Sequence, residues 1–157
     1  MRKMRESPEL RTVQDPDTPI YSIGTVARML EISVFTLRMY EREGLVLPHK
    51  SASNQRRYSQ NDIDRLKCIR QAITEKKFGI AAIKTIYSLI PCWSILPCFK
   101  EDREHCEAYA NHAQPCWAYR HVNNICASRE CRECRVYRDH SDCRKVKQSI
   151  MNISPAP

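Results

Sequence analysis

The chain has 157 residues and a formal net charge of +8 at pH 7, with 26 Lys and Arg against 18 Asp and Glu. This length suits one domain or two small ones, and the basic balance favours a polyanionic partner such as nucleic acid. No run of apolar residues approaches the roughly 20 needed to span a bilayer, and the start lacks the apolar region of a secretory signal. We therefore expect a cytoplasmic protein without membrane contact, in a reducing compartment where clustered cysteines bind metal or carry redox chemistry.

Composition divides the chain into four segments. We predict a flexible arm over residues 1–19, which is rich in Pro, Asp and Arg, and a flexible tail over residues 152–157. Between them we predict a helical domain over 20–90 and a cysteine-rich domain over 91–151. Residues 1–91 carry 16 Lys and Arg against 10 Asp and Glu, a net +6, so the excess positive charge falls mainly on the first half.

The first domain begins with two short helices. Ser22 is a candidate N-cap for a helix whose apolar residues recur at helical spacing as far as Leu30, and Ser33 is a candidate cap for a second helix that reaches Arg42. Gly44 then supplies a stop signal. Two short helices joined by a tight turn predict a helix-turn-helix, whose second helix enters the major groove of DNA.

A hairpin and two further helices follow. The apolar Leu45–Leu47 run, a polar loop and the basic Arg56-Arg57-Tyr58 predict a two-stranded wing that carries cations to the phosphate backbone. Ser59 and Asp62 begin a third helix, Gly79 separates it from a fourth, and Pro91 ends the fourth.

This pattern resembles the N-terminal winged helix-turn-helix of the MerR family of bacterial transcription regulators. The resemblance rests on Ile20-Tyr21-Ser22-Ile23-Gly24, on Thr36-Leu37-Arg38-Met39-Tyr40-Glu41-Arg42-Glu43-Gly44-Leu45, and on Arg56-Arg57-Tyr58-Ser59. It implies a homodimer that binds double-stranded promoter DNA and acts on RNA polymerase indirectly, by bending and untwisting the promoter. Asn54 and Gln55 depart from the family's usual wing, where a glycine and an aromatic residue are common.

The resemblance also implies which residues contact DNA. The set is Thr36, Arg38 and Tyr40 in the second helix with Arg56, Arg57 and Tyr58 in the wing. Arginine offers a planar fork for phosphate or guanine, and tyrosine offers a hydroxyl on a rigid stem, so the chemistry of these side chains agrees. Thr36 and Arg56 are expected to support the contacts that the other four make.

The usual dimer element of the family is missing. A long antiparallel helix follows the fourth helix in the family, but here Pro91 and Pro97 interrupt that region. The segment 135–151 has an apolar stripe at helical spacing. It could supply the dimer contact or pack on its own cysteine domain, and the sequence leaves both open.

The cysteine-rich segment contains a repeat. Each of two units begins Pro-Cys-Trp, at Cys92 and Cys116, and ends Cys-x-x-Tyr, at Tyr109 and Tyr137. The arrangement resembles a two-Cys-Trp module appended to bacterial signalling proteins. The predicted metal ligands are Cys92, Cys98, Cys106, Cys116, Cys126, Cys131 and Cys134.

Cys131-x-x-Cys134 places two thiolates on one turn, close enough to share a metal. An iron-sulfur cluster is favoured because the ligands are dispersed and aromatic residues accompany them, with zinc as the alternative and a metal-free thiol–disulfide switch third. Few large apolar residues follow position 99, so metal binding is expected to stabilise this segment. Cys68 and Cys143 are expected to be structural or spare thiols, and the histidines to be solvated or packed.

These observations predict a mainly α protein, a winged helix-turn-helix followed by a small cysteine-rich, metal-stabilised domain. The predicted function is a transcription regulator that senses redox state or metal. One alternative is a constitutive DNA-binding protein with structural zinc, and a weaker one is an electron carrier. With three glycines, no nucleotide-binding loop and no hydrolytic triad, we do not expect an enzyme.

Overall fold

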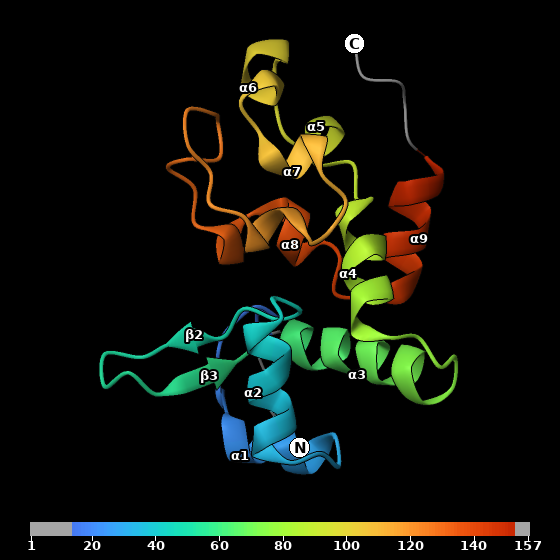
Figure 1. The fold of residues 1–157 in the computed structure, drawn as a ribbon. Coiled ribbons are helices and arrows are strands. Elements are labelled where there is room, and N and C mark those ends of the chain that lie inside the picture. Colours follow the sequence, from blue (N-terminus) through green and yellow to red (C-terminus); the bar gives the residue numbers. More distant parts are fainter. Residues whose placement is uncertain (1–13, 153–157) are drawn as a thin grey trace, which may run out of the picture.

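The structure is a computed structural model that describes residues 14–152, so the predictions for 1–13 and 153–157 lie outside the described residues. The described chain is mainly helical and contains the predicted winged helix-turn-helix, which confirms the fold class. Figure 1 shows this domain at one end, the cysteine-rich segment at the other, and α4 and α9 between them.

The first half has a helix-turn-helix, a wing and two longer helices. Its elements are β1 (Tyr21–Ser22), α1 (Ile23–Met29), α2 (Val34–Arg42), β2 (His49–Lys50), β3 (Arg56–Tyr58), α3 (Gln60–Thr74) and α4 (Ile80–Ser88). The second half has shorter elements. They are α5 (Cys92–Ile95), α6 (Lys100–Glu104), α7 (Glu107–Ala110), the 3-10 turns η1 (Cys116–Ala118) and η2 (Cys131–Glu133), α8 (Arg135–Arg138) and α9 (Cys143–Met151).

The predicted caps define both short helices. The Ser22 hydroxyl accepts the Thr25 N–H at 3.2 Å, and the Ser33 hydroxyl accepts the Thr36 N–H at 3.0 Å. Gly44 lies just beyond α2 with a φ of +71°, and a Cβ there would come within 2.9 Å of the Ala118 Cβ. The turn therefore requires glycine both for its backbone conformation and for the approach of the cysteine-rich half.

The wing is a three-stranded antiparallel sheet in the order β1-β3-β2, with Tyr21 opposite Tyr58 and His49 opposite Arg57. Its outer strand, β2, begins later in the chain than the sequence predicts. Leu45 and Val46 are fully buried, and the strand forms instead at His49–Lys50, within the predicted polar loop. Burial of the apolar pair in the core explains this shift.

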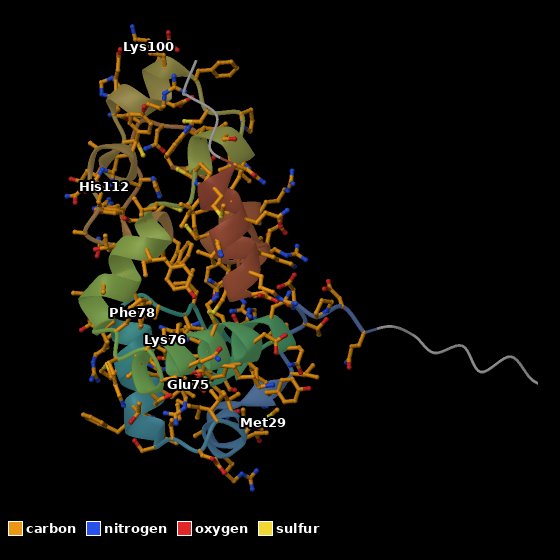
Figure 2. The ribbon with its side chains drawn as sticks, turned by 90° about the vertical axis from the view of Figure 1, so that its right-hand side faces the viewer. Met29, Glu75, Lys76, Phe78, Lys100 and His112 are labelled. Carbon is orange, nitrogen blue, oxygen red and sulfur yellow. A yellow bond between two sulfur atoms is a disulfide. The ribbon has the colours of Figure 1, made fainter. Side chains whose placement is uncertain are left out.

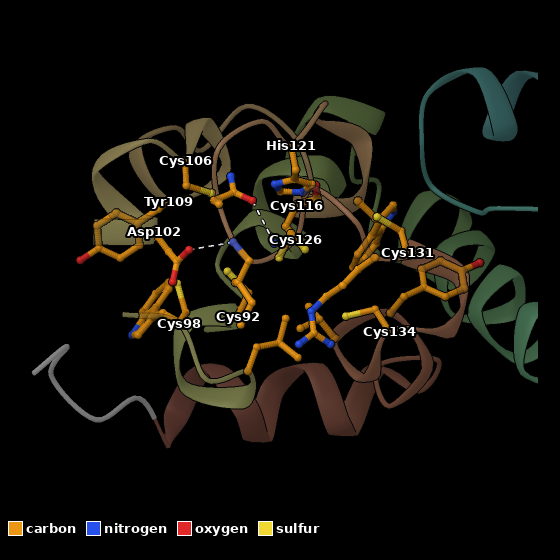
Figure 3. A pocket seen from close by; sticks show the side chains of 18 residues that line it. Cys92, Cys98, Asp102, Cys106, Tyr109, Cys116, His121, Cys126, Cys131 and Cys134 are labelled. Atoms are coloured by element: carbon orange, nitrogen blue, oxygen red, sulfur yellow. Dashed lines mark hydrogen bonds between the residues drawn. The ribbon is translucent and has the colours of Figure 1, made fainter. Parts of the chain in front are cut away.

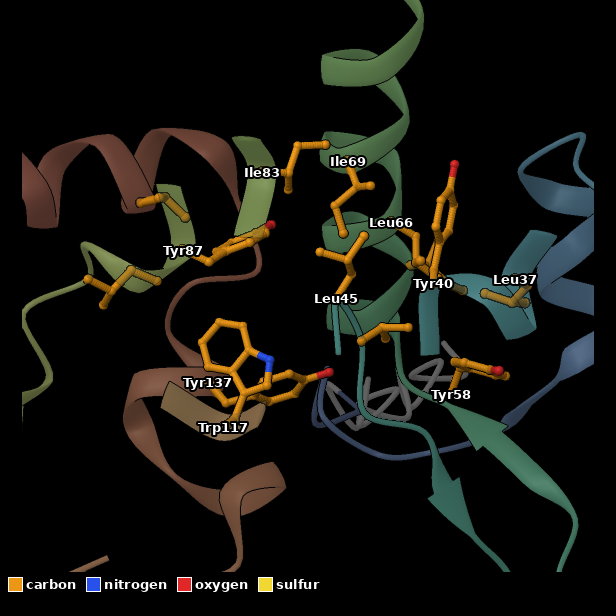
Figure 4. Packing of buried hydrophobic residues seen from close by; sticks show 14 of the residues in the cluster. Leu37, Tyr40, Leu45, Tyr58, Leu66, Ile69, Ile83, Tyr87, Trp117 and Tyr137 are labelled. Atoms are coloured by element: carbon orange, nitrogen blue, oxygen red, sulfur yellow. The ribbon is translucent and has the colours of Figure 1, made fainter. Parts of the chain in front are cut away.

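One continuous hydrophobic core joins the two halves (Figure 4). The core includes Leu45, Leu66 and Ile69 of the first half together with Trp117 and Tyr137 of the second. The cysteine-rich segment, which has few large apolar residues of its own, thus obtains much of its burial from the helix-turn-helix domain.

The segment 135–151 is two helices, α8 and α9, and not one. Val136 and His140 are buried, as is Val146 in α9, so the predicted stripe packs on the chain itself. A disulfide between Cys68 in α3 and Cys143 at the start of α9, with a Cα–Cα distance of 5.8 Å, adds a covalent link between the halves.

The described end of the predicted arm contacts the rest of the chain. Asp17 accepts hydrogen bonds from Asn61 at 2.9 Å and from Arg138 at 2.7 Å. Between residues 14 and 152, no helix is both long and apolar enough to cross a membrane.

Candidate functional site

The exposed face of α2 carries an aromatic ring between cations. Phe35 is 71% exposed, and the Arg42 guanidinium lies 5.7 Å from its ring centroid. Arg38 is exposed on the same face, three residues after Phe35 and four before Arg42. Thr36 is half-buried, and its hydroxyl lies 2.9 Å from that of its capping residue, Ser33.

The cations of the wing differ in their surroundings. Arg56 donates from Nε to the Glu41 carboxylate at 2.6 Å, and this contact raises the pKa of Arg56. Arg57 is half-exposed, and its Nη2 donates to the Gln55 side-chain oxygen at 3.4 Å. Tyr58 also donates to Glu41, so that carboxylate joins the wing to α2.

The two predicted tyrosines lie in the core. Tyr58 is fully buried, which raises the pKa of its phenol, and Tyr40 is 3% exposed (Figure 4). Their role as DNA contacts stays a prediction, whereas Arg38 and Arg57 present side chains at the surface. Phe35 and Arg42 share the exposed face of α2 with Arg38 but were not among the predicted DNA contacts. Their spacing from Arg38, at i−3 and i+4 on a capped helix, was the available signal.

All seven predicted ligand cysteines line one cavity of about 30 Å³ (Figure 3). Both tryptophans line it as well, each packed edge-on against a tyrosine of the repeat: Trp93 lies 5.4 Å from Tyr109 and Trp117 lies 5.2 Å from Tyr137, between ring centroids. The duplicated Pro-Cys-Trp and Cys-x-x-Tyr sequences thus build two equivalent walls around the thiols. Cys68 and Cys143 lie elsewhere, bonded to each other.

The thiols perturb one another. The Cys116 thiol donates to Cys92, which lowers the pKa of Cys92 and raises that of Cys116. Burial, together with nearby Cys134 and Cys92, raises the pKa of Cys126 to about 12. Thiols grouped in a small volume keep their protons because neighbouring thiolates repel, and a bound cation reverses that balance.

The donor set of the cavity fits a soft metal, since thiolates are the ligands of zinc and of iron-sulfur clusters. The spacing of the donors is looser than a formed site. Among residues 14–152, no three His, Cys, Asp or Glu side chains converge closely enough to hold a metal ion. The structure therefore brings the predicted cysteines together around one space without assembling a particular set of four.

The cysteine walls are hydrogen-bonded to the helix-turn-helix half. Trp117, next to Cys116, donates from Nε1 to the Gly44 carbonyl at 2.8 Å. Tyr137, three residues after Cys134, accepts the Leu47 N–H at 2.9 Å through its hydroxyl. The partners of these two side chains, the Gly44 carbonyl and the Leu47 N–H, both lie in the segment that connects α2 to the wing.

A buried ion pair reinforces this junction. Arg132, between Cys131 and Cys134, donates to the Asp62 carboxylate at 2.7 Å and also to the Leu47 carbonyl. Asp62 is 1% exposed and forms the capping box of α3 with Ser59. From the sequence, Asp62 was predicted only to begin a helix, and no motif indicated a partner 70 positions later.

A second buried cation lies behind the aromatic walls. Arg65 is 1% exposed, and its guanidinium lies 4.0 Å from the Tyr137 ring centroid and 5.2 Å from that of Trp117. It donates from Nη2 to the Tyr137 carbonyl, but Nε and Nη1 meet no hydrogen-bond partner among the described residues. A cation in this place favours negative charge in the adjoining cavity, because the dielectric constant of the interior is low.

Comparison with known proteins finds similarity in the first half of the chain. The family model for MerR HTH family regulatory proteins matches residues 21–89. HspR of Streptomyces coelicolor, named as a heat shock protein, is 40% identical over 73 residues, which cover 46% of this chain and 48% of HspR. The HTH-type transcriptional regulator GlnR of Bacillus anthracis is 32% identical over 68 residues, 43% of this chain and 52% of GlnR.

A third relative extends further. The mercuric resistance operon regulatory protein of Pseudomonas fluorescens is 30% identical over 94 residues, 59% of this chain and 57% of that protein. The chain thus spans about half the length of the curated relatives it matches.

Proposed function

We propose that this chain, whose residues 21–89 form a helix-turn-helix domain of the MerR family, is a transcription regulator that binds promoter DNA under the control of its cysteine site. One observation carries the proposal. The residues that wall the cysteine cavity, Trp117 and Tyr137, are also the residues that hydrogen-bond the connection between α2 and the wing. A change in what the thiols hold would alter those walls, and with them the placement of the DNA-binding elements.

The proposed DNA surface consists of the α2 face and the wing. Phe35, Arg38 and Arg42 would enter or border the major groove, and Arg57 would contact phosphate from the wing. Arg56, Tyr40 and Tyr58 would hold these elements in place, since Arg56 is paired with Glu41 and the tyrosines are buried. We further propose a homodimer that acts on RNA polymerase through the shape of the promoter, as the family similarity suggests.

We propose that the cavity holds an iron-sulfur cluster, with zinc as the alternative. Four of the seven cysteines would ligate it, among them the adjacent pair Cys131 and Cys134. A metal bound by four thiolates carries net negative charge, which the buried Arg65 would stabilise through the Trp117 and Tyr137 rings. A cluster would supply a reversible one-electron change of charge. The two tryptophans would keep water from it.

Anaerobic purification tests this proposal. The absorption spectrum is recorded and iron, sulfide and zinc are measured on the same sample. Visible absorption with stoichiometric iron and sulfide supports the cluster, whereas a colourless protein with stoichiometric zinc rejects it in favour of zinc. A chain with neither metal, but with pairs of these cysteines in reversible disulfides, rejects both.

DNA binding is tested separately. Duplexes selected from a random pool provide a specific target, and their affinity is measured with the cysteine site loaded and stripped. A difference in affinity supports a sensor. Equal affinity would reject sensing and favour the second candidate, a constitutive DNA-binding protein with structural metal. That candidate is supported by the way Trp117 and Tyr137 complete the core of the first half.

A further inference from the structure

An apolar groove of about 740 Å³ lies between α3, α4 and α9. Its walls include Ile69 and Ala72 of α3, Ile83 and Ile86 of α4, and Val146 and Ile150 of α9. The volume falls within the roughly 300–1,000 Å³ of small-molecule sites, which are also mainly apolar. The groove shares no lining residue with the cysteine cavity, so it is a separate feature of the molecule.

Two lysines supply the charge of this groove. Lys76 lies in the turn between α3 and α4, close to Phe78 (Figure 2), and Lys147 lies in α9. No Asp or Glu belongs to the described lining. Within residues 14–152, neither ammonium group forms an ion pair or a side-chain hydrogen bond. An apolar slot with unpaired positive charge is complementary to a molecule that is apolar along its length and negative at one end.

The groove is fixed and open in this conformation. The Cys68–Cys143 disulfide lies in its lining and ties α9 to α3, with a Cα–Cα distance of 5.8 Å. Phe78 remains 43% exposed and Met151 remains 72% exposed, although both belong to the lining. Large apolar side chains left exposed beside a preformed hollow are typical of binding surfaces.

We propose that this groove binds a free amphipathic monoanion with a single linear alkyl chain, the class to which long-chain carboxylates belong. The chain would lie along Ile69, Ile83 and Ile86, and the carboxylate would meet Lys76 and Lys147. The apolar walls contribute affinity through burial of the chain, while the two ammonium groups select the sign of the head group. The inference goes beyond the proposed function and does not depend on the cysteine site.

Isothermal titration of the full chain with dodecanoate, below its micellar concentration, tests the proposal. Binding of one dodecanoate is expected, with much weaker binding of hexanoate, which has too little chain to bury, and of dodecyltrimethylammonium, which has the wrong charge. The Lys76→Glu/Lys147→Glu double variant should bind dodecanoate roughly tenfold more weakly, because two exposed attractions become repulsions. Lys67→Glu/Lys145→Glu, a matched pair on α3 and α9 outside the lining, should leave the affinity unchanged.

A space-filling variant separates the groove from other surfaces. Ala72→Phe places a ring in the hollow and should abolish binding, with the circular dichroism spectrum and DNA affinity retained as evidence of folding. Trp117 provides a second readout in a Trp93→Phe background. Tyr87 lines the groove and packs on Trp117 with 5.6 Å between ring centroids, so dodecanoate should change Trp117 fluorescence.

Four results would overturn the proposal. The first three are absence of dodecanoate binding, equal binding of the cationic amphiphile, and equal affinity in the Lys76→Glu/Lys147→Glu variant. The fourth is a dimer, seen by sedimentation, that Ala72→Phe dissociates and dodecanoate does not compete with, since the occupant would then be a second copy of the chain. Loss of metal from the cysteine site would leave each of these outcomes unaffected.

Discussion

The Tyr137 hydroxyl donates to the buried Asp62 carboxylate at 2.9 Å, across 75 residues of sequence. The same hydroxyl accepts the Leu47 N–H at 2.9 Å. One side chain of the cysteine repeat is therefore hydrogen-bonded both to the first turn of α3 and to the segment that precedes the wing. This junction connects the cysteine-rich half to α3 and to the segment between α2 and the wing, and the first two predictions concern it.

Tyr137→Phe should destabilise the fold by about 1–3 kcal/mol, because it leaves the part-buried Leu47 N–H without this partner and removes a donor from the buried Asp62 carboxylate. Urea unfolding measures the loss. Tyr109→Phe is the matched control from the other repeat unit, since the Tyr109 hydroxyl bonds to none of the described residues. Equal effects of the two substitutions would show that the hydrogen bonds of Tyr137 are energetically unimportant.

Trp117→Phe should uncouple the cysteine site from DNA binding. The substitution keeps an aromatic wall but removes the Nε1–H bond to the Gly44 carbonyl. The ratio of DNA affinities with the site loaded and stripped should fall toward one, while the metal content stays that of the wild type. Trp93→Phe is the control, because its indole N–H lacks a hydrogen-bond partner among the described residues. A wild-type ratio in Trp117→Phe would refute transmission by this bond.

Arg57→Ala should weaken DNA binding roughly tenfold and lower the slope of log affinity against log salt by about one, the loss expected for a single phosphate contact. Fluorescence anisotropy over a salt series gives both quantities. Arg144→Ala, an exposed cation on α9, is the control for net charge alone. If both variants lose affinity equally, Arg57 acts only through the overall charge.

Cys143→Ser should lower the free energy of unfolding by about 4 kcal/mol, the chain-entropy contribution of a cross-link that spans 75 residues. Dithiothreitol should lower the melting temperature of the wild type, reducing the disulfide with two electrons and two protons from its own thiols. Dithiothreitol should not lower the melting temperature of Cys143→Ser, because that variant has no Cys68–Cys143 disulfide to reduce. The variant should also retain its metal. Loss of metal on the substitution would instead make Cys143 a ligand.

His140 should make stability depend on pH. Burial lowers its pKa, while its ring contacts the Val136 carbonyl and the Ser149 hydroxyl. The unfolded chain, with a pKa of about 6.5, takes up the proton first as the pH falls, so stability is retained above that value and lost from there down to the lowered folded pKa. Urea unfolding between pH 8 and pH 5 should show a shallower decline in His140→Gln, because the substitution removes the imidazole that takes up a proton on unfolding. Identical declines would contradict this origin.

The helices and turns of the first half could be predicted because they depend on local interactions. Ser22 and Ser33 cap helices, Gly44 adopts a left-handed turn and Ser59 forms a capping box with Asp62, and each of these features depends on residues within a few positions. The wing strand was misplaced because Leu45 and Val46 look equally suited to a strand and to the core. Only their complete burial in the folded chain distinguishes the two.

The sequence by itself determined the helix-turn-helix, the surface arginines Arg38 and Arg57, and the set of seven cysteines that face one cavity. Tertiary structure alone decided that Tyr40 and Tyr58 are core residues, that Cys68 pairs with Cys143, and that Asp62 meets Arg132 and Tyr137. The physical reason is the distance along the chain over which each kind of interaction acts. Caps, turns and repeats act between neighbours in the chain, whereas burial and pairing depend on which distant segments pack together to remove apolar surface from water.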